Sequence, residues 1–260
     1  MAPPQHPVTG NNAMARLKTV IHVHTHYSYD SDRSPEDLVH DARCAGVDCA
    51  AVTDHDEIAG ALVARELGGV QIIVGEEITS ADGHIIGLFL HERVPPGLSA
   101  EETAHRIRDQ GGLVLAPHPF TILCDHSLGP RALARLRPWL DAVEVCNAQD
   151  FLPWENTRAR RFAAEHQVTP YVGDDSHMRG YLAACYQMVP AFDGPVEFRA
   201  ALRQAVLVSG RQPLGYFATM AVRQAWRRIA RRPLRDRGGS APAIRARAIT
   251  DGKGSPAQAD

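Results

Sequence analysis

The sequence predicts an α/β fold in which a parallel sheet, closed into a barrel, is covered by helices. Two observations predict it. Short strand-like segments alternate along the chain with helix-like segments, and the strand-like segments are apolar throughout instead of alternating with polar residues. Strands that are apolar on both faces are typical of parallel sheets buried beneath helices. About seven such units in roughly 200 residues favour a barrel over an open sheet.

The expected strands are short and often rich in β-branched residues, which favour extended backbone. They cover residues 17–23, 49–53, 71–75, 84–90, 113–116, 142–146, 170–173 and 184–189. Polar residues follow most of these segments, so the strand ends are also the candidate site positions.

The expected helices have recognisable starts and stops. Ser34 followed by Pro35 predicts an N-cap with proline in the first turn, and Gly46 predicts the stop. Ser99 and Glu102 match a capping box for a helix that stops at Gly111. The remaining predicted helices cover 57–67, 131–137, 157–166 and 196–205.

Composition bounds the function. The 260 residues hold 28 Lys and Arg against 30 Asp and Glu, so a chain-wide polyanion-binding role is excluded while a local basic patch is not. No apolar run approaches the roughly 18 residues of a membrane span. The five cysteines form no C-x-x-C pair and the first residues do not form a secretory signal, so we expect a cytoplasmic protein without a disulfide framework.

The chain divides into four predicted parts. Residues 1–15 are expected to be a disordered leader, 16–215 the barrel domain, 216–232 a basic amphipathic helix and 233–260 a disordered tail. The amphipathic pattern of the 216–232 helix favours a helix that docks its apolar face on the barrel and leaves its arginines in solvent. The alternative is a contact surface for nucleic acid, acidic lipid or a phosphorylated partner.

Histidine is the residue that stands out, with 13 copies. His22 and His24 lie at the end of the first predicted strand, and their alternation predicts that both rings point to one face. Polar clusters follow the other strands in the same way, and in a parallel α/β fold these ends share one rim. The clusters contain His55, Glu77, His84, His118, Asn147, Asp175 and His177.

Mixed imidazole and carboxylate ligands suit Zn, Mn or Fe, and the number of candidates exceeds what one ion can use. The sequence therefore predicts two or three divalent ions. A single histidine at a strand end is more often an ordinary surface or core residue, and Thr53-Asp54-His55 alone could be a capped turn. The repetition at successive strand ends is what favours a metal centre.

The ordered motifs HVHTHYSYDS, GVDCAAVTDHD, GEEITSADGHIIGL, APHPF and GDDSH resemble those of the PHP (polymerase and histidinol phosphatase) family over about residues 18–190. The resemblance implies a distorted (β/α)7 barrel with the active site at the C-terminal ends of the strands. It also implies a di- or trinuclear metal centre and hydrolysis of phosphoesters.

The resemblance also implies a ligand set. His22, His24, Glu77 and Asp175 would bind the first ion, and Glu77 would bridge to a second ion held by His84 and His118. His55 and His177 would bind a third ion. Asp30 would join them at a position where some relatives use histidine, which changes the charge of that site.

The implied chemistry is in-line attack on phosphorus by a metal-bridged hydroxide. Asp175 and His177 are the expected catalytic residues, and His177 is one candidate for the general acid beside a metal-bound water. Asn147, Arg158 and Arg179 are the expected substrate-binding residues. The two arginines are candidates because phosphate binding commonly uses cationic side chains, and Asn147 could position the substrate. Each of the three also has a plain structural explanation as a cap or a solvated helix charge.

The sequence thus predicts a metal-dependent hydrolase acting on a phosphomonoester of a small metabolite or nucleotide. The first alternative is a phosphodiesterase or exonuclease on oligonucleotides, for which the basic helix would guide the substrate. A non-catalytic binding domain of the same fold is a further alternative, and an amidohydrolase on a similar barrel is disfavoured by the order of the motifs.

Overall fold

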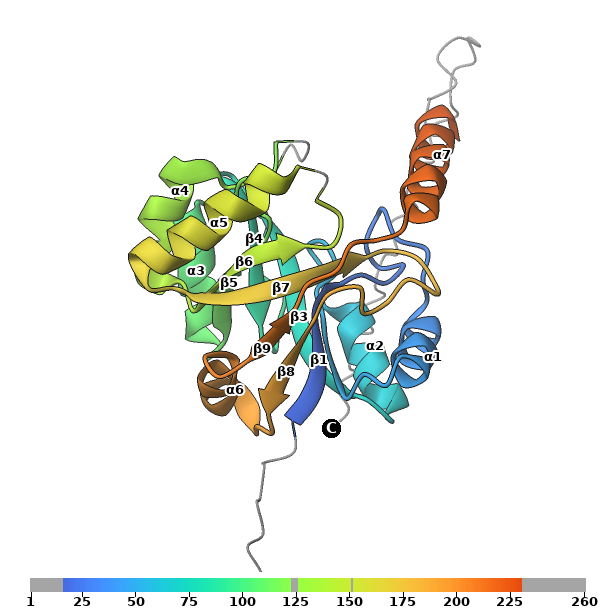
Figure 1. The fold of residues 1–260 in the computed structure, drawn as a ribbon, viewed down its shortest axis with the longest axis horizontal. Coiled ribbons are helices and arrows are strands. Elements are labelled where there is room, and N and C mark those ends of the chain that lie inside the picture. Colours follow the sequence, from blue (N-terminus) through green and yellow to red (C-terminus); the bar gives the residue numbers. More distant parts are fainter. Residues whose placement is uncertain (1–15, 123–125, 151, 231–260) are drawn as a thin grey trace, which may run out of the picture. The chain divides into compact units, whose positions relative to one another are not determined.

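The computed structural model describes residues 16–122, 126–150 and 152–230 (Figure 1). The expected leader, residues 1–15, and the expected tail, residues 233–260, lie outside this described part. The chain separates into two compact units, Met1–Met220 and Ala221–Asp260.

The strands form one sheet that closes on itself. Seven of them, β1 to β7, make a closed barrel, because β1 pairs with both β2 and β7. Strand β8 pairs with the first residues of β1, Arg16 to Thr19, and β9 pairs with β8. The strands are β1 (Arg16–Val23), β2 (Cys49–Val52), β3 (Gln71–Ser80), β4 (Gly83–Leu88), β5 (Leu113–Ala116), β6 (Ala142–Asn147), β7 (Thr169–Ser176), β8 (Tyr186–Pro190) and β9 (Val206–Val208).

The predicted barrel and α/β class are therefore confirmed, but the sheet is not purely parallel as expected. Strand β4 runs antiparallel to both β3 and β5, and β8 runs antiparallel to β1. Apolar content does not encode strand direction, which is why the composition of these segments did not reveal the reversal. The short β9 was not expected from the sequence.

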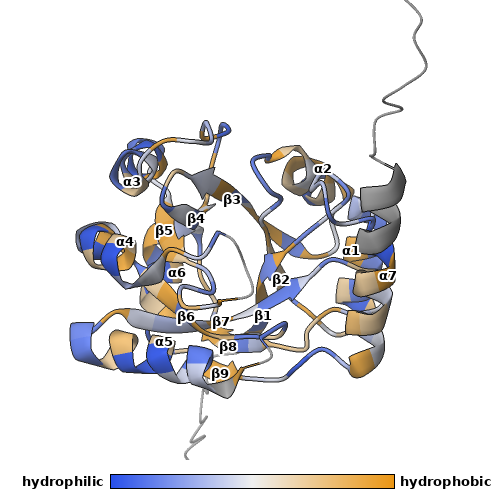
Figure 2. Ribbon diagram, turned by 90° about the horizontal axis from the view of Figure 1, so that it is seen from above, coloured by the Kyte–Doolittle hydropathy of each residue, from blue (hydrophilic) through white to orange (hydrophobic). Residues whose placement is uncertain are grey.

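Helices surround the barrel, as the view from above shows (Figure 2). Ser34 and Ser99 cap their helices as predicted, each accepting a hydrogen bond from the backbone N–H three residues later. Glu102 does not complete the capping box, since its carboxylate accepts from Arg106 Nε instead. The helices are α1 (Pro35–Cys44), α2 (Ala59–Leu67), α3 (Ala100–Asp109), α4 (Gly129–Leu136), α5 (Pro153–His166), α6 (Gly194–Leu202) and α7 (Leu214–Ala230), with a 3₁₀ turn at Arg137–Trp139.

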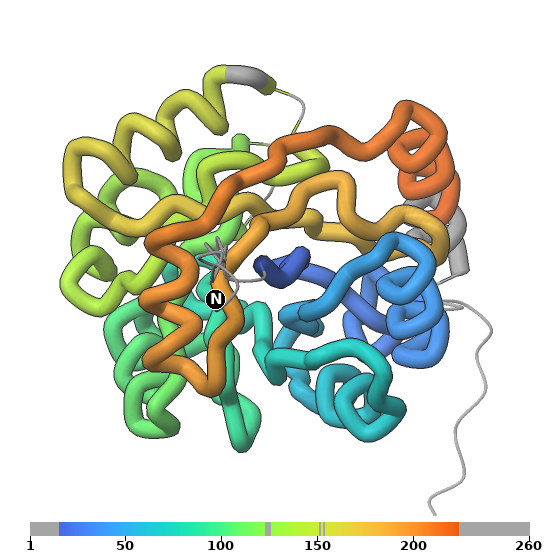
Figure 3. The backbone as a smooth tube through the Cα atoms, turned by 60° about the horizontal axis from the view of Figure 1, so that its bottom comes forward, coloured from blue at the N-terminus to red at the C-terminus, as the bar shows by residue number. Residues whose placement is uncertain are grey.

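Two apolar layers hold the barrel together. Outward-facing strand residues such as Val52 and Val74 pack beneath the surrounding helices. Inward-facing residues, among them Ile73 and Tyr171, fill the barrel together with Phe198 of α6. Helix α6 thus closes the end of the barrel near the start of β1 (Figure 3). The opposite end remains for polar side chains.

Helix α7 begins in the first compact unit, where Tyr216 and Met220 pack against Met178. The arginines of the predicted basic face at positions 227, 228, 231 and 232 lie outside the residues whose side chains are described. Among the described residues, no helix is long and apolar enough to cross a membrane.

Candidate metal centre

Glu77 lies at the centre of a buried cluster of imidazoles. The residue is 1% exposed and sits within β3, where the strand continues beyond the end predicted at residue 75. Glu77 Oε2 lies 3.1 Å from His22 Nε2, 3.3 Å from His24 Nε2 and 3.4 Å from His55 Nδ1. These three histidines come from the ends of β1 and β2, so the rim predicted from the sequence brings them together.

The second oxygen of Glu77 faces another pair of imidazoles. Glu77 Oε1 lies 2.9 Å from His84 Nδ1 and 3.0 Å from His118 Nε2. His84 is the second residue of β4, and the antiparallel direction of that strand places its first residues on the same rim as the last residues of the parallel strands. A carboxylate with imidazoles around both oxygens is suited to bridge two cations.

Asp175 supplies a second buried carboxylate on β7. Its Oδ1 lies 3.5 Å from both His22 Nε2 and His24 Nε2, and 3.6 Å from His177 Nδ1. Asp175 therefore faces the same two histidines as Glu77 and links them to His177.

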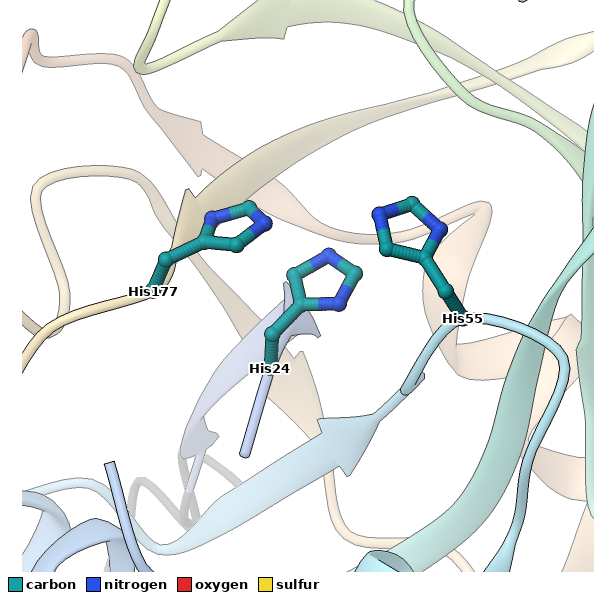
Figure 4. Close-up of side chains that lie close together, drawn as sticks. All are labelled: His24, His55 and His177. Atoms are coloured by element: carbon teal, nitrogen blue, oxygen red, sulfur yellow. The ribbon is translucent and has the colours of Figure 1, made fainter. Parts of the chain in front are cut away.

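Asp30 supplies a third carboxylate from the loop after β1. Its Oδ2 lies 3.2 Å from His177 Nε2 and 3.5 Å from His55 Nε2. Figure 4 shows the rings of His177 and His55 on either side of His24, each carried at the end of a different strand. The His24 ring stacks on both neighbours, with centroids 4.1 Å from His177 and 4.8 Å from His55.

The donor atoms fit divalent ions. Among the described residues, His24 Nε2, His55 Nδ1 and His84 Nδ1 are buried and make no well-directed hydrogen bond, although each lies 2.9 to 3.4 Å from an oxygen of Glu77. Such unsatisfied polar atoms are costly in a protein interior, and an ion would satisfy them. Overlapping groups of candidate ligands have their donor atoms within 4.8 Å of one another: His22, His24 and Glu77; His24, His55 and His177; His22, His118 and Asp175; and His55, Glu77 and His84.

Backbone strain coincides with this cluster. His22, His118 and Asp175 have positive φ angles of 68°, 21° and 48°. Non-glycine residues adopt this region rarely, and it is typical of functional sites that the surrounding structure holds in place. At His22 the pairing register of β1 also shifts, so a local irregularity and not simple strand alternation turns its ring toward the cluster.

The charges of the cluster support one another. Burial opposes the ionised forms of Glu77 and Asp175, but the surrounding histidines hold the pKa of both carboxyls well below the usual range. Burial also opposes the protonation of His22, yet Asp175, Glu77 and Glu144 raise its pKa well above the usual value. Protons on imidazoles therefore balance the carboxylates in the metal-free cluster, in the place that cations would take.

Glu144 is a site residue that sequence reasoning missed. Its Oε1 accepts a hydrogen bond from His22 Nδ1 at 3.0 Å, and its Oε2 accepts from the His118 backbone N–H at 2.6 Å. Because His22 Nδ1 donates its proton in a hydrogen bond to this carboxylate, Nε2 is the nitrogen that would lose its proton and present a lone pair to an ion. The available signal was a lone charge inside the apolar segment Ala142–Cys146, since an unpaired buried glutamate is rare.

Ser28 and Asp54 orient His24 in a similar way. Ser28 Oγ donates to Asp54 Oδ1 at 3.0 Å, so His24 Nδ1, 3.0 Å away, must donate to Ser28, and Nε2 is the nitrogen that faces Glu77. Asp54 also accepts from the Thr25 backbone N–H and hydroxyl, both at 2.6 Å. The Asp54 carboxylate thus anchors the loop that follows β1.

The three expected substrate-binding residues lie in different surroundings. Asn147 is buried at the cluster, and its Nδ2 donates to Glu144 Oε2 and to Asp175 Oδ2 at 3.0 and 2.9 Å. Arg158 is exposed on α5 and lies over the Phe120 ring, 4.8 Å from its centroid. Arg179 is exposed and pairs with Asp37 of α1 at 3.2 Å. Only Asn147 is therefore in contact with the cluster in this arrangement of the described residues.

The family model for the PHP domain matches residues 21–139. An uncharacterised protein of Methanocaldococcus jannaschii is 40% identical over 145 residues, which are 51% of this chain and 82% of that protein. The chain belongs to the PHP family. This PHP protein is accordingly a hydrolase of the metal-dependent phosphoesterase class, as the motifs predicted.

Two relatives with named activities match shorter stretches. Phosphoribosyl 1,2-cyclic phosphate 1,2-diphosphodiesterase of Eggerthella lenta is 39% identical over 84 residues, 29% of this chain and 32% of that enzyme. A 5′-3′ exoribonuclease of Haemophilus influenzae is 35% identical over 97 residues, 35% of each chain. Each match spans about a third of the named enzyme's length.

The fold is shared with solved structures. A two-domain protein of Bacteroides vulgatus, described as containing a predicted PHP-like metal-dependent phosphoesterase, superposes with a TM-score of 0.63 at 20% identity. The superposition covers 76% of this chain and 66% of that chain. The barrel of this PHP protein is thus the fold expected from its motifs.

Proposed function

We propose that this PHP protein hydrolyses phosphoesters at the buried cluster, with two or three Zn, Mn or Fe ions bound there. The single observation that supports this best is the convergence of imidazoles from separate strand ends on both oxygens of Glu77. Such an arrangement has little structural purpose unless the ring nitrogens bind cations.

The contacts suggest how the ions would be shared. His22, His24, Glu77 and Asp175 would hold the first ion. Glu77, His84 and His118 would hold the second. Asp30, His55 and His177 would hold the third, in keeping with the 3.2 and 3.5 Å contacts of Asp30 to those two rings.

Bound divalent ions would lower the pKa of water toward neutrality and offset charge on the phosphate oxygens. The protein's own residues keep the ligand atoms available for this. Glu144 holds the His22 ring by its Nδ1, and Asn147 holds Asp175 by an amide hydrogen bond. With two ions bound, His177 Nε2 would be available to protonate the leaving oxygen. With a third ion bound to His177, a metal-bound water would take that role.

For the substrate, we favour a phosphodiester of nucleotide type over the phosphomonoester that the sequence predicted first. Both relatives with named activities cleave diesters of ribose phosphates by their names, a cyclic phosphate and an RNA chain. The two arginines expected to bind a phosphate group are engaged with Phe120 and Asp37 instead. A phosphomonoester of a small metabolite or nucleotide remains the second candidate.

The rim of the cluster offers a surface for a nucleobase. Tyr29 stacks on His55, with ring centroids 4.9 Å apart, while 56% of the residue is exposed. One ring face thus lies on a proposed ligand, and more than half of the residue is exposed to solvent. Stacking of a base on an aromatic side chain contributes about 1–3 kcal/mol. Tyr29→Leu should therefore raise KM for nucleotide diesters about tenfold or more, and leave KM for a diester without a base unchanged.

One experiment tests the reaction. The purified protein is analysed for metals and assayed on phosphomonoesters and nucleotide phosphodiesters with added Mn, Zn and Fe. We expect bound metal and faster turnover of the diesters. Absence of both bound metal and turnover would refute the proposal, and turnover confined to monoesters would promote the second candidate.

Variants test the assignment of the cluster. His24→Ala or Asp175→Ala should abolish turnover without unfolding the chain. His26→Ala is the matched control, because His26 lies two residues from His24 but is exposed and stacks on Tyr27. Turnover retained by His24→Ala at the level of His26→Ala would mean that the ligand assignment is wrong.

A further inference from the structure

The segment Asp175-Ser176-His177, at the end of β7, carries two proposed ligands, Asp175 and His177. Asp175 has a positive φ of 48°, which an aspartate adopts only at some energetic cost. The side chains of Asp175 and His177 approach one another, with Asp175 Oδ1 3.6 Å from His177 Nδ1. Their relative positions therefore depend on what holds the backbone between them.

Tyr216 holds this backbone from one side. Its hydroxyl accepts a hydrogen bond from the His177 backbone N–H at 3.2 Å and donates to the Asp175 carbonyl at 3.4 Å. The residue is fully buried in the first turn of α7, where its ring packs against Met178 and Tyr181. One hydroxyl thus spans the two peptide groups that flank Ser176.

Arg33 holds the same backbone from the other side. Its Nη2 donates to the Ser176 carbonyl at 2.7 Å and to the His24 carbonyl at 2.9 Å. Arg33 Nε also donates to the His24 carbonyl, at 3.2 Å, and the whole residue is buried. A buried guanidinium carries a large desolvation cost, which hydrogen bonds to several acceptors offset.

We infer that Tyr216 and Arg33 are positioning residues of the metal centre, which hold Asp175, His177 and His24 in the arrangement that binds the ions. The inference rests on the proposed function of the cluster. It extends the site beyond the ligands and beyond residues 21–139 that match the family model, because Tyr216 belongs to the C-terminal helix. It also gives the start of α7 a role in the metal centre, separate from any role of its arginines.

Tyr216→Phe is the most direct test, because it keeps the buried ring and removes only the hydroxyl. Tyr181→Phe is the matched control: the Tyr181 ring lies 5.3 Å from that of Tyr216, and its backbone carbonyl, which the substitution retains, accepts from Gln212. The readouts are the affinity for Mn and Zn by competition with a chelator, the number of ions retained after dialysis, and the visible absorption of the Co-substituted protein. None of these depends on turnover.

We expect Tyr216→Phe to weaken the binding of at least one ion by about 10- to 100-fold, the usual effect of residues that support metal ligands. The Co spectrum should change, while Tyr181→Phe matches wild type in both measurements. Arg33→Lys, which keeps the charge but not the forked geometry, should act in the same direction as Tyr216→Phe.

The outcomes separate the two proposals. A wild-type protein that binds no metal would refute the proposed function itself. A wild-type protein that binds metal, together with a Tyr216→Phe variant that matches Tyr181→Phe in affinity, ion count and Co spectrum, would overturn the role of Tyr216 alone.

Discussion

Replacement of Glu144 by glutamine should weaken metal binding by removing one charge from the wall of the barrel. Glu144 Oε1 accepts from His22 Nδ1 at 3.0 Å, whereas Oε2 accepts from both the His118 N–H and Asn147 Nδ2, at 2.6 and 3.0 Å. A glutamine has one acceptor oxygen and one donor amide. The orientation with fewer conflicts keeps its oxygen toward His118 and Asn147 and turns its NH₂ toward His22.

That orientation changes the tautomer of His22. With a donor facing it, Nδ1 must accept, so the proton moves to Nε2 and blocks the nitrogen that faces Glu77 and Asp175. Hydrogen bonds to charged groups contribute roughly 1.5–3 kcal/mol, and residues that support ligands typically alter metal affinity by about 10- to 100-fold. The two estimates overlap, so we expect a loss of about 10- to 100-fold in affinity and a comparable loss in kcat.

The assay is chelator competition at fixed pH, accompanied by circular dichroism to confirm folding. Glu155→Gln is the control, since Glu155 is also buried on the neighbouring α5 but accepts from the backbone N–H of Ile122 rather than from a proposed ligand. Metal affinity of Glu144→Gln within about twofold of the Glu155→Gln value would refute the argument from the His22 tautomer.

Further predictions concern the same centre. Gly173→Ala should lower both stability and metal affinity, because an added Cβ would overlap Glu144 Oε1. Overpacking of this kind costs about 1–3 kcal/mol of stability. A urea unfolding curve unchanged from wild type would contradict this prediction. Burial opposes protonation of His55 and His118, yet neighbouring carboxylates raise both pKa values to about 9. Protons should therefore compete with metal below pH 9, and affinity should rise with pH by about tenfold per unit for each imidazole that must lose a proton. In the metal-free protein, the stability contributed by these raised pKa values is fully present below about pH 6.5 and lost as the pH rises through 9. Urea unfolding of chelator-treated protein at pH 6 and at pH 9.5 measures this difference in stability. Greater stability at pH 9.5 would contradict the prediction. Asp30→Asn should reduce the number of ions retained by one while the other two remain, as elemental analysis would reveal, and an unchanged ion count would mean that Asp30 is not a ligand.

The direction of β4 depends on the length of the turn before it. The apolar content of residues 84–90 predicts a strand, and strand β4 occupies Gly83–Leu88. Its antiparallel direction follows from the two-residue turn Ala81-Asp82, since Ser80 at the end of β3 pairs with Gly83 at the start of β4 and two-residue turns join antiparallel strands. The hairpin explains why His84, at the beginning of its strand, meets residues from the ends of others.

The sequence by itself determined the fold class, the family and the candidate ligands, because each of these depends on local patterns. Apolar strand segments, helix caps and the histidine and carboxylate clusters at the strand ends can be recognised without knowing any contact. The common rim of a barrel then predicts that side chains such as His22, Glu77 and Asp175 lie together, and in the structure they do.

The tertiary structure decided which residues hold those ligands in place. Glu144 meets His22 across 122 positions, and Tyr216 meets His177 across 39. Neither contact has a local signature, because a hydrogen bond between distant residues depends on strand order, register and helix docking together. The ligand types follow from the chemistry of single residues, whereas their tautomers and orientations follow from partners that only the folded chain brings within reach.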